Sequence, residues 1–385
     1  MSDSTDSREI RPFRLDVPQD QLDDLARRLA ATRWPIDGPV SGWAQGMPRE
    51  YAHELVEYWR EDYDWRAQEA RLNRHPQFLT RIFGHDVHFL HVRSAEQDAL
   101  PLMLTHGWPG SIVEFLEVIG PLTDPAGHGG NRADAFHVVV PTIPGFGIPG
   151  PTTSEWTTRR VAEAWAELMN RLGYHRYAAH GGDYGSVISR HLGIVDRDHV
   201  VALHLTALLG SSARADSADP DDLEQQESLA KAQRYQRELI GYALLQSTRP
   251  QSLAYALTDS PVGQLAWIVE RFKDWTDSTD RPEDAVDRDL LLTNVMIYWL
   301  FATAGSSARY YFAGAKDWGS PQEISSTPTA VALMPRDIAR PARQIAEKTD
   351  NIVRWQELAH GGHFAALEQP ELIVTDLREA LRPYR

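Results

Sequence analysis

The 385-residue chain contains no cysteine, which excludes disulfides, thiolate metal ligands and a cysteine nucleophile. Basic residues are outnumbered: 39 Lys and Arg stand against 54 Asp and Glu, so the formal net charge is −15. A negative field of this kind repels the phosphates of nucleic acids and the anionic heads of lipids. We therefore expect no nucleic acid partner.

Long apolar runs are also absent. No apolar stretch of 18 residues occurs, and the first nine residues, from Met1 to Glu9, lack the basic and apolar regions of a secretory signal. Together with the missing cysteine, these features predict a soluble cytoplasmic protein that does not associate with a membrane.

The residues that are present have the balance of a globular enzyme, with 42% hydrophobic and 24% charged side chains. The length suits roughly two or three folded units of about 150 residues, or one α/β core with insertions. From residue 102 onward, short apolar runs alternate with helical patterns, as a parallel βα arrangement requires. The runs cover residues 102–104, 136–140, 177–179 and 200–205.

The domain organisation follows from where these patterns change. Residues 1–95 hold no complete strand-turn-helix unit, and after Pro18 and Pro48 their apolar residues recur at helical spacing, so we expect an N-terminal accessory segment. A first part of the core spans 96–210, and residues 211–320 are almost wholly helical in pattern. Strand-like runs return at 331–333 and 352–355, so residues 321–385 complete the same sheet around a helical insertion.

The most informative motif is Gly181-Gly-Asp-Tyr-Gly185, between an apolar run and a helical pattern. Small residues two before and two after Asp183 allow a sharp turn from strand to helix that exposes its side chain. This spacing is typical of a nucleophile elbow, and Asp183 occupies the position at which most proteins with such an elbow carry Ser. A glycine turn in which Asp183 caps the helix is the alternative interpretation.

A second motif, His106-Gly-Trp-Pro-Gly110, directly follows the run 102–104. Gly107 and Pro109 force a tight loop, and such a loop can direct a backbone N–H at a site above the sheet. An ordinary βα turn explains the same residues equally well.

A third motif, Gly361-Gly-His-Phe364, follows the run 352–355. A histidine on such a loop serves as a general base when a carboxylate orients its other ring nitrogen. Asp337, 26 residues before His363 and at the end of a strand-like run, is the natural orienting acid. His360 competes for the role, and a loop histidine is also common as a surface or packing residue. The order nucleophile, acid, histidine is that of the α/β-hydrolases.

Taken together, these motifs resemble those of microsomal-type epoxide hydrolases, within the α/β-hydrolase superfamily. The stretches 11–18 and 33–35 resemble that family's N-terminal domain, and 106–109, 181–186 and 361–370 resemble its catalytic signatures. The resemblance implies an α/β-hydrolase fold with a mostly parallel central sheet, an inserted helical cap and an N-terminal accessory segment.

The resemblance also implies an activity: conversion of a small epoxide and water to a vicinal diol through a covalent aspartyl ester. Asp183 is the implied nucleophile, and His363, oriented by Asp337, is the implied general base. The backbone N–H groups of Trp108 and Tyr184 are the implied oxyanion hole.

The resemblance also implies two cap tyrosines that donate protons to the departing oxygen. The sequence around each tyrosine identifies its counterpart in this chain. Tyr242 matches the first, and Tyr311, preferred over its neighbour Tyr310, matches the second. The cap aromatics Trp267, Trp275, Tyr298 and Trp299 point to an apolar or aromatic pocket, although such residues more often form core.

No cofactor and no metal are expected. The sequence from Gly145 to Gly150 satisfies G-x-G-x-x-G, but Pro149 prevents the helix whose N-terminus would bind a pyrophosphate. His85, His88 and His91 lie near a strand-like run, yet their spacing alternates between faces and no carboxylate completes a metal shell.

Three features set the chain apart from some relatives. It has no apolar anchor, which indicates the soluble bacterial branch, and Tyr184 stands where some relatives carry Trp. Asp337 stands where the vertebrate branch has Glu, and this shorter side chain could alter how the histidine is placed.

Alternative functions remain open at this point. A haloalkane or haloacid dehalogenase shares the aspartate, the histidine and the ester, but its halide needs ring N–H donors and not phenols. A catalytically silent α/β-hydrolase scaffold that binds a partner is the other alternative. The biological role is either detoxification or natural-product biosynthesis, including enediyne pathways, and the N-terminal segment either wraps the core or contributes to a homodimer.

Overall fold

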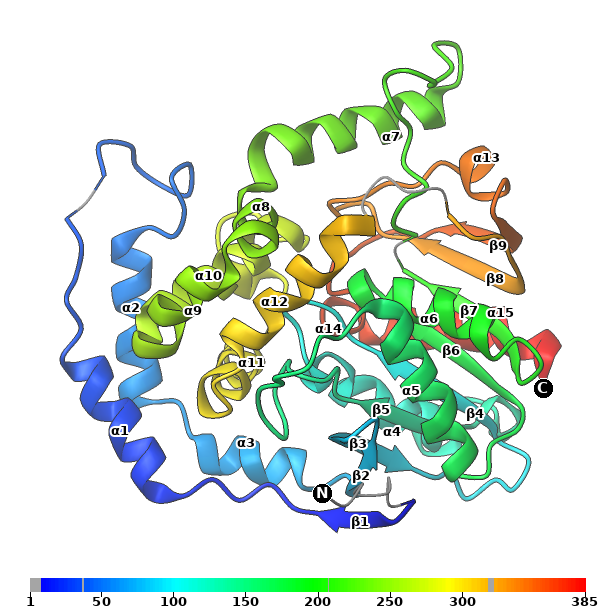
Figure 1. Ribbon diagram of the computed structural model, residues 1–385, viewed down its shortest axis with the longest axis horizontal. Helices are drawn as coiled ribbons and strands as arrows, with labels where there is room; N and C mark the ends of the chain where they lie inside the picture. The colour runs from blue at the N-terminus through cyan, green and yellow to red at the C-terminus, as the bar shows by residue number, and fades with distance from the viewer. Residues whose placement is uncertain (1–7, 37, 207, 318–321) are drawn as a thin grey trace, which may run out of the picture.

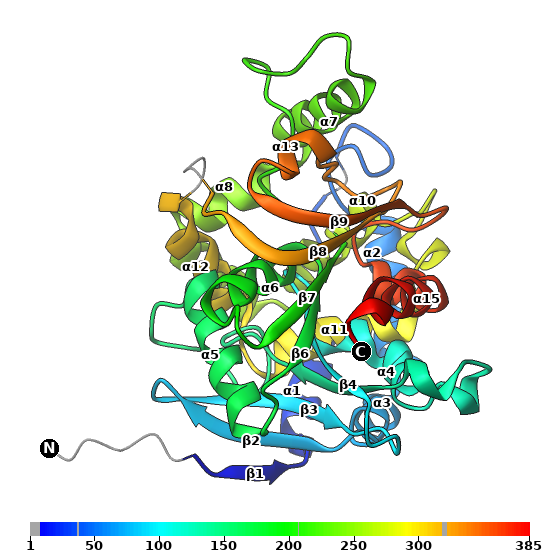
Figure 2. The same ribbon diagram turned by 90° about the vertical axis from the view of Figure 1, so that its right-hand side faces the viewer.

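The computed structural model describes residues 8–36, 38–206, 208–317 and 322–385, which build one twisted nine-stranded sheet. The strand order is β1-β2-β3-β5-β4-β6-β7-β8-β9, and Figure 2 shows the strands stacked from β1 at the bottom to β9 at the top. The strands are β1 (Ile10–Phe13), β2 (Gln77–Ile82), β3 (His85–Val92), β4 (Leu100–Thr105), β5 (Phe136–Pro141), β6 (Tyr177–Gly181), β7 (Val200–Leu205), β8 (Ser325–Leu333) and β9 (Asp350–Glu357).

The sheet is parallel from β5 through β9 and antiparallel from β1 to β5. In the parallel part the strand ends are aligned, because Gly181 at the end of β6 pairs with Thr105 of β4 on one side and Leu205 of β7 on the other. The loops that follow β4, β6, β8 and β9 therefore leave the same edge of the sheet. In open α/β sheets this edge is where sites form.

The predicted mostly parallel α/β sheet is confirmed, and the N-terminal segment of residues 1–95 also contributes strands to it. Three strands of that segment, β1 to β3, extend the sheet on one side. A two-residue turn joins β2 to β3, and both of its residues, Phe83 and Gly84, have positive φ, which suits a tight hairpin. Phe83 is an unusual residue in such a turn, so the hairpin lacks its usual sequence signal.

Helices cover both faces of the sheet. On one side lie α5 (Thr158–Arg171) and α6 (Asp183–Val195), and on the other α4 (Leu116–Thr123) and α15 (Pro370–Leu381) (Figure 2). Every residue of β5 is buried, as expected for a strand covered on both faces. Two short helices, α13 (Arg343–Ala346) and α14 (Ala365–Glu368), lie near β9 and α15 in sequence.

The segment between β7 and β8 forms a helical cap beside the aligned strand ends (Figure 1). No single helix of the described residues is long and apolar enough to cross a membrane; the last two cap helices reach that length and composition only as a pair bent by 85°. The cap consists of α7 (Leu223–Arg234), the π-helical turn η4 (Tyr235–Leu239), α8 (Gly241–Thr248), α9 (Pro250–Asp259), α10 (Pro261–Trp275), α11 (Arg288–Leu300) and α12 (Ala304–Gly314).

Residues 19–72 form a segment that we call the N-terminal strap, containing α1 (Gln19–Ala30), α2 (Arg49–Glu61) and α3 (Trp65–Leu72). The strap packs on the cap (Figure 1). The Tyr51 hydroxyl donates to Glu283 at 2.8 Å, and the Tyr58 hydroxyl donates to Asp289 at 2.7 Å. The buried Trp59 ring contacts the cap as well, through its N–H to the sulfur of Met296.

Candidate active site

Asp183 lies at the turn from β6 into α6. Its φ is +49°, a left-handed backbone conformation that residues other than glycine rarely adopt. A Cβ on Gly185 would lie 1.9 Å from the Thr105 carbonyl oxygen, so only glycine lets α6 approach β4 this closely. Gly182, and not Asp183, occupies the helix N-cap, so the geometry is that of the elbow and the capping interpretation was wrong.

The loop after β4 contacts Asp183 directly. The Trp108 backbone N–H donates to Asp183 Oδ1 at 2.9 Å. A Cβ on Gly107 would lie 2.3 Å from the same oxygen, so this approach requires glycine. Burial lowers the pKa of His106 to about 4, so its ring is neutral and accepts the Ile143 N–H at 3.1 Å. These bonds fix the loop against the sheet.

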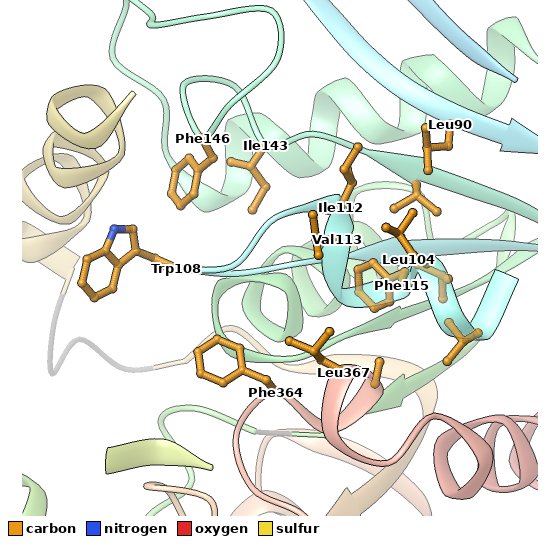
Figure 3. Packing of buried hydrophobic residues seen from close by; sticks show 14 of the residues in the cluster. Leu90, Leu104, Trp108, Ile112, Val113, Phe115, Ile143, Phe146, Phe364 and Leu367 are labelled. Atoms are coloured by element: carbon orange, nitrogen blue, oxygen red, sulfur yellow. The ribbon is translucent and has the colours of Figure 1, made fainter. Parts of the chain in front are cut away.

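The buried Trp108 ring lies at the cap side of the hydrophobic core. In Figure 3 it extends toward the cap helices, whereas Ile112, Val113 and Phe115 of the same loop region pack among the other core residues. Its ring lies parallel to that of Tyr242, with centroids 5.0 Å apart. Core and cap therefore meet at this tryptophan.

His363, on the loop after β9, lies between two carboxylates. Its Nδ1 is 2.8 Å from Asp337 Oδ1, and its Nε2 is 3.2 Å from Asp183 Oδ2. Burial alone would lower the pKa of His363, but the two carboxylates outweigh it and raise that pKa well above the usual value. Both carboxylates therefore favour the protonated form of the His363 ring. His360, the competing histidine, is exposed.

The contact between His363 and Asp183 is an ion pair and not a hydrogen bond. Among the described residues, Nε2 of His363 has no hydrogen-bond partner although it is buried. This nitrogen is therefore available to a water molecule, while Nδ1 stays bonded to Asp337.

Tyr242 on α8 and Tyr311 on α12 line a cavity of about 390 Å³ together with Asp183 and His363. Burial raises the pKa of both phenols well above the usual value, so both carry their protons at neutral pH. Tyr310, which was predicted to be less suitable than Tyr311 as the second proton donor, is not among the residues that line this cavity. The structure thus brings both predicted tyrosines to the nucleophile.

Tyr184, the second residue of α6, also lines the cavity. The first N–H groups of an α-helix have no partner within the helix, so the Tyr184 N–H is free to face the elbow. Its ring lies edge-on to that of Tyr311, with centroids 5.0 Å apart.

The remaining cavity wall is mostly apolar, and the cap aromatics predicted for it lie elsewhere. Trp267, Trp275, Tyr298 and Trp299 do not line it; Trp275, for example, packs edge-on against the His363 ring. The other lining residues are Leu209, Ser212, Ala232, Tyr235, Gln236, Ile240, Ala243, Ile338 and Ala339. A wider hollow of about 980 Å³, between the strap and the start of α10, contains none of the predicted site residues.

Two carboxyls that the sequence did not single out lie near the site, the buried Glu368 and the partly buried Glu114. Glu368 accepts the N–H groups of Gly362 at 2.9 Å and Phe364 at 3.0 Å, the residues on either side of His363. Burial raises the pKa of Glu114 to about 8, opposed by a hydrogen bond from the Gly107 backbone. Glu368 lies inside the motif 361–370, but only the folded loop reveals its partners.

The described residues contain no cluster of three or more His, Asp or Glu side chains that could hold a metal ion. His88, one of the three histidines considered, bonds to Thr142 at 2.8 Å and Gln77 at 2.9 Å inside the sheet. Burial lowers its pKa to about 3, so it is a neutral structural residue.

An elbow after β6, an orienting acid after β8 and a histidine after β9, all at one edge of the sheet, define an α/β-hydrolase. The family model described as alpha/beta hydrolase fold matches residues 100–370, and the one described as epoxide hydrolase N terminus matches residues 10–115. A Stigmatella aurantiaca protein provisionally named as an epoxide hydrolase is 47% identical, over 98% of this chain and 86% of its own. Epoxide hydrolase 1 of Sus scrofa is 33% identical, over 98% and 89% respectively.

Solved structures of epoxide hydrolases have the same fold as this chain. The Aspergillus niger epoxide hydrolase superimposes with a TM-score of 0.87 at 31% identity, covering 99% of this chain and 98% of that one. The juvenile hormone epoxide hydrolase of Bombyx mori gives 0.88 at 26% identity, covering 99% and 96%. The chain therefore belongs to the epoxide hydrolase family.

Proposed function

We propose that this enzyme hydrolyses an epoxide to a vicinal diol through a covalent ester on Asp183, without a cofactor. The observation that carries the proposal is one cavity that joins Asp183 and His363 to the phenols of Tyr242 and Tyr311. An epoxide carbon is saturated, so a serine would leave an ether that water does not readily cleave. An aspartate leaves an ester, which the histidine can hydrolyse.

In the first half of the reaction, a carboxylate oxygen of Asp183 forms a bond to one epoxide carbon as the bond from that carbon to the ring oxygen breaks. The electron pair goes to the ring oxygen, which takes a proton from Tyr242 or Tyr311. The Trp108 N–H, at 2.9 Å from Oδ1, holds the carboxylate in place for the attack.

Ester formation then changes the charge around His363. Asp183 is neutral once esterified, so one of the two anions that raise the pKa of His363 is gone and that pKa falls. The imidazolium releases its proton, which restores the phenol by way of water. The neutral ring keeps its Nδ1–H on Asp337 and presents Nε2 as the base.

In the second half, His363 takes a proton from water while the oxygen of that water attacks the ester carbonyl. The Trp108 N–H stabilises the oxyanion, with the Tyr184 N–H as the second donor. As the adduct collapses, the bond between its carbon and the diol oxygen breaks, and that oxygen takes the remaining proton of the attacking water. The diol leaves, and the Asp183 carboxylate is restored beside the His363 imidazolium. One epoxide and one water give one diol, and every proton is accounted for.

A single-turnover reaction in H₂¹⁸O tests this sequence. Because water attacks the carbonyl carbon, we expect ¹⁸O in the Asp183 carboxylate, read by peptide mass spectrometry, and unlabelled diol. Label in the diol with none in the protein would contradict the ester. Asp183→Ala, the control, should form neither ester nor diol, and halide release from matched haloalkanes would indicate the dehalogenase instead.

The cavity also limits the substrate. About 390 Å³ with a mostly apolar wall suits a compact epoxide with apolar substituents, so we propose this class. Comparing kcat/KM across a panel of aryl and alkyl epoxides tests the limit, and a preference for charged epoxides would contradict it. Detoxification or biosynthesis, a cytoplasmic location and a homodimer stay predictions.

A further inference from the structure

A third tyrosine reaches the proton donors of this cavity. The hydroxyl oxygen of Tyr235 is 3.0 Å from that of Tyr242, and Tyr235 lines the same cavity. Tyr235 is half-buried, whereas Tyr242 is buried. The two hydroxyls thus form a short chain from the inner part of the cavity to its more exposed side.

The fold brings these residues together through an irregular helix. On a straight α-helix, residues seven apart are separated by about 10 Å along the axis. Here the π-helical turn η4 begins at Tyr235, and Ile240 separates it from α8, so the helix does not run straight to Tyr242. Such π turns often occur at functional sites.

The direction of the hydrogen bond follows from proton counting. Each phenol carries one proton, and Tyr242 can give its proton to the substrate oxygen only if that proton is not already donated to Tyr235. In the reactive arrangement Tyr235 is therefore the donor and the Tyr242 oxygen is the acceptor.

We propose that Tyr235 is a positioning residue for Tyr242, an inference that rests on the proposed function. Its O–H donates to the Tyr242 oxygen, turns the proton of Tyr242 toward the epoxide, and stays bonded to the phenolate that forms. Tyr235 keeps its own proton throughout, so no covalent bond of Tyr235 changes while Tyr242 transfers its proton to the ring oxygen.

Because of the surroundings of Tyr242, the bond from Tyr235 contributes strongly to the stability of a Tyr242 phenolate. Its ring is buried against Trp108 and Trp275, so a phenolate at this position is costly. The Arg271 guanidinium lies 5.2 Å from the ring centroid, over its face. The Tyr235 hydroxyl bonds to the oxygen itself, and a bond to a charged oxygen is roughly twice as strong as one between neutral groups.

Tyr235→Phe tests the proposal, because it removes the hydroxyl and keeps the ring. We expect ester formation, measured by rapid quench and intact mass, to slow by about 10- to 100-fold. The rate of ester hydrolysis should change little, because water attacks the ester after the ring oxygen has already received its proton. The matched control is Tyr255→Phe on the exposed side of the cap, where the side chain is 73% exposed, and it should leave both steps unchanged.

A double-mutant cycle separates this role from a structural one. In a Tyr242→Phe background, Tyr235→Phe should cause no further loss, whereas in a Tyr311→Phe background it should cause the full loss. An equal loss in both backgrounds, no loss in either, or slower ester hydrolysis would overturn the proposal. If the wild-type enzyme formed no ester with any epoxide, the proposed function would fail first, and the two failures are thereby distinguished.

Discussion

Replacing Asp337 by Asn tests how the negative charge of Asp337 orients the His363 ring and stabilises its protonated form. Nδ1 of His363 lies 2.8 Å from Asp337 Oδ1, and both side chains are almost completely buried, at 2% and 3% exposure. Asparagine keeps the size of the side chain but removes its negative charge and can present an N–H to the ring. The base then loses both its tautomer preference and the anion that stabilises its protonated form.

The magnitude follows from the distance and the burial. Two unit charges about 4 Å apart attract by ~4 kcal/mol at an effective dielectric constant of about 20. If the transition state for ester hydrolysis uses most of this energy, that step slows by about 10³-fold. Ring opening does not use His363 as a base, so ester formation should change by less than about 10-fold.

The assay is rapid mixing with an epoxide, acid quench and intact-mass measurement. We expect the ester to accumulate to nearly one equivalent in Asp337→Asn and to decay slowly. Asp337→Glu, which restores the charge on a longer side chain, is the matched comparison and should recover part of the hydrolysis rate. Equal slowing of both steps, or normal turnover in Asp337→Asn, would refute the reasoning.

Three further outcomes are expected. Gly185→Ala places a Cβ 1.9 Å from the Thr105 carbonyl oxygen, so urea unfolding should show a loss of at least ~1–3 kcal/mol. Replacing Tyr242 and Tyr311 together by Phe should abolish ester formation in the quench assay, whereas either single replacement should leave residual ring opening. Burial raises the pKa of Glu114 from 4.5 to about 8, so between these pH values its carboxyl is protonated in the folded protein and ionised in the unfolded chain. The unfolding free energy should therefore fall by up to ~1.4 kcal/mol per pH unit from about pH 4.5 to 8, and Glu114→Gln should lack this contribution in urea titrations.

The parts of the site that could be predicted are those written in short stretches of sequence. Asp183 and His363 lie on sharp loops whose glycines are required by direct contacts: Gly185 and Gly362 leave no room for a Cβ. A turn that needs glycine at fixed positions is visible in sequence, so the position of Asp183 followed from its neighbours alone.

The rest depends on contacts between distant segments. That β2 and β3 join the central sheet as a hairpin was not predicted, because their turn has Phe83 in place of the usual small or polar residue. Tyr235 was missed because a π-helical turn has no readable periodicity, and its partner Tyr242 lies seven residues away, on what would be a straight helix. Glu368 was visible, but its two backbone partners exist only in the folded loop.

The N-terminal strap has a consequence for how molecules reach Asp183. Tyr51 and Tyr58 bond to cap residues Glu283 and Asp289, and Arg28 of the strap bonds to the Asp259 carbonyl oxygen at the end of α9. A cap held on its outer side by the chain's own beginning has little freedom to swing as a lid. We therefore expect substrate selectivity to depend on the residues that line the cavity of about 390 Å³ and not on movement of the cap, and changes to selectivity should be sought among those residues.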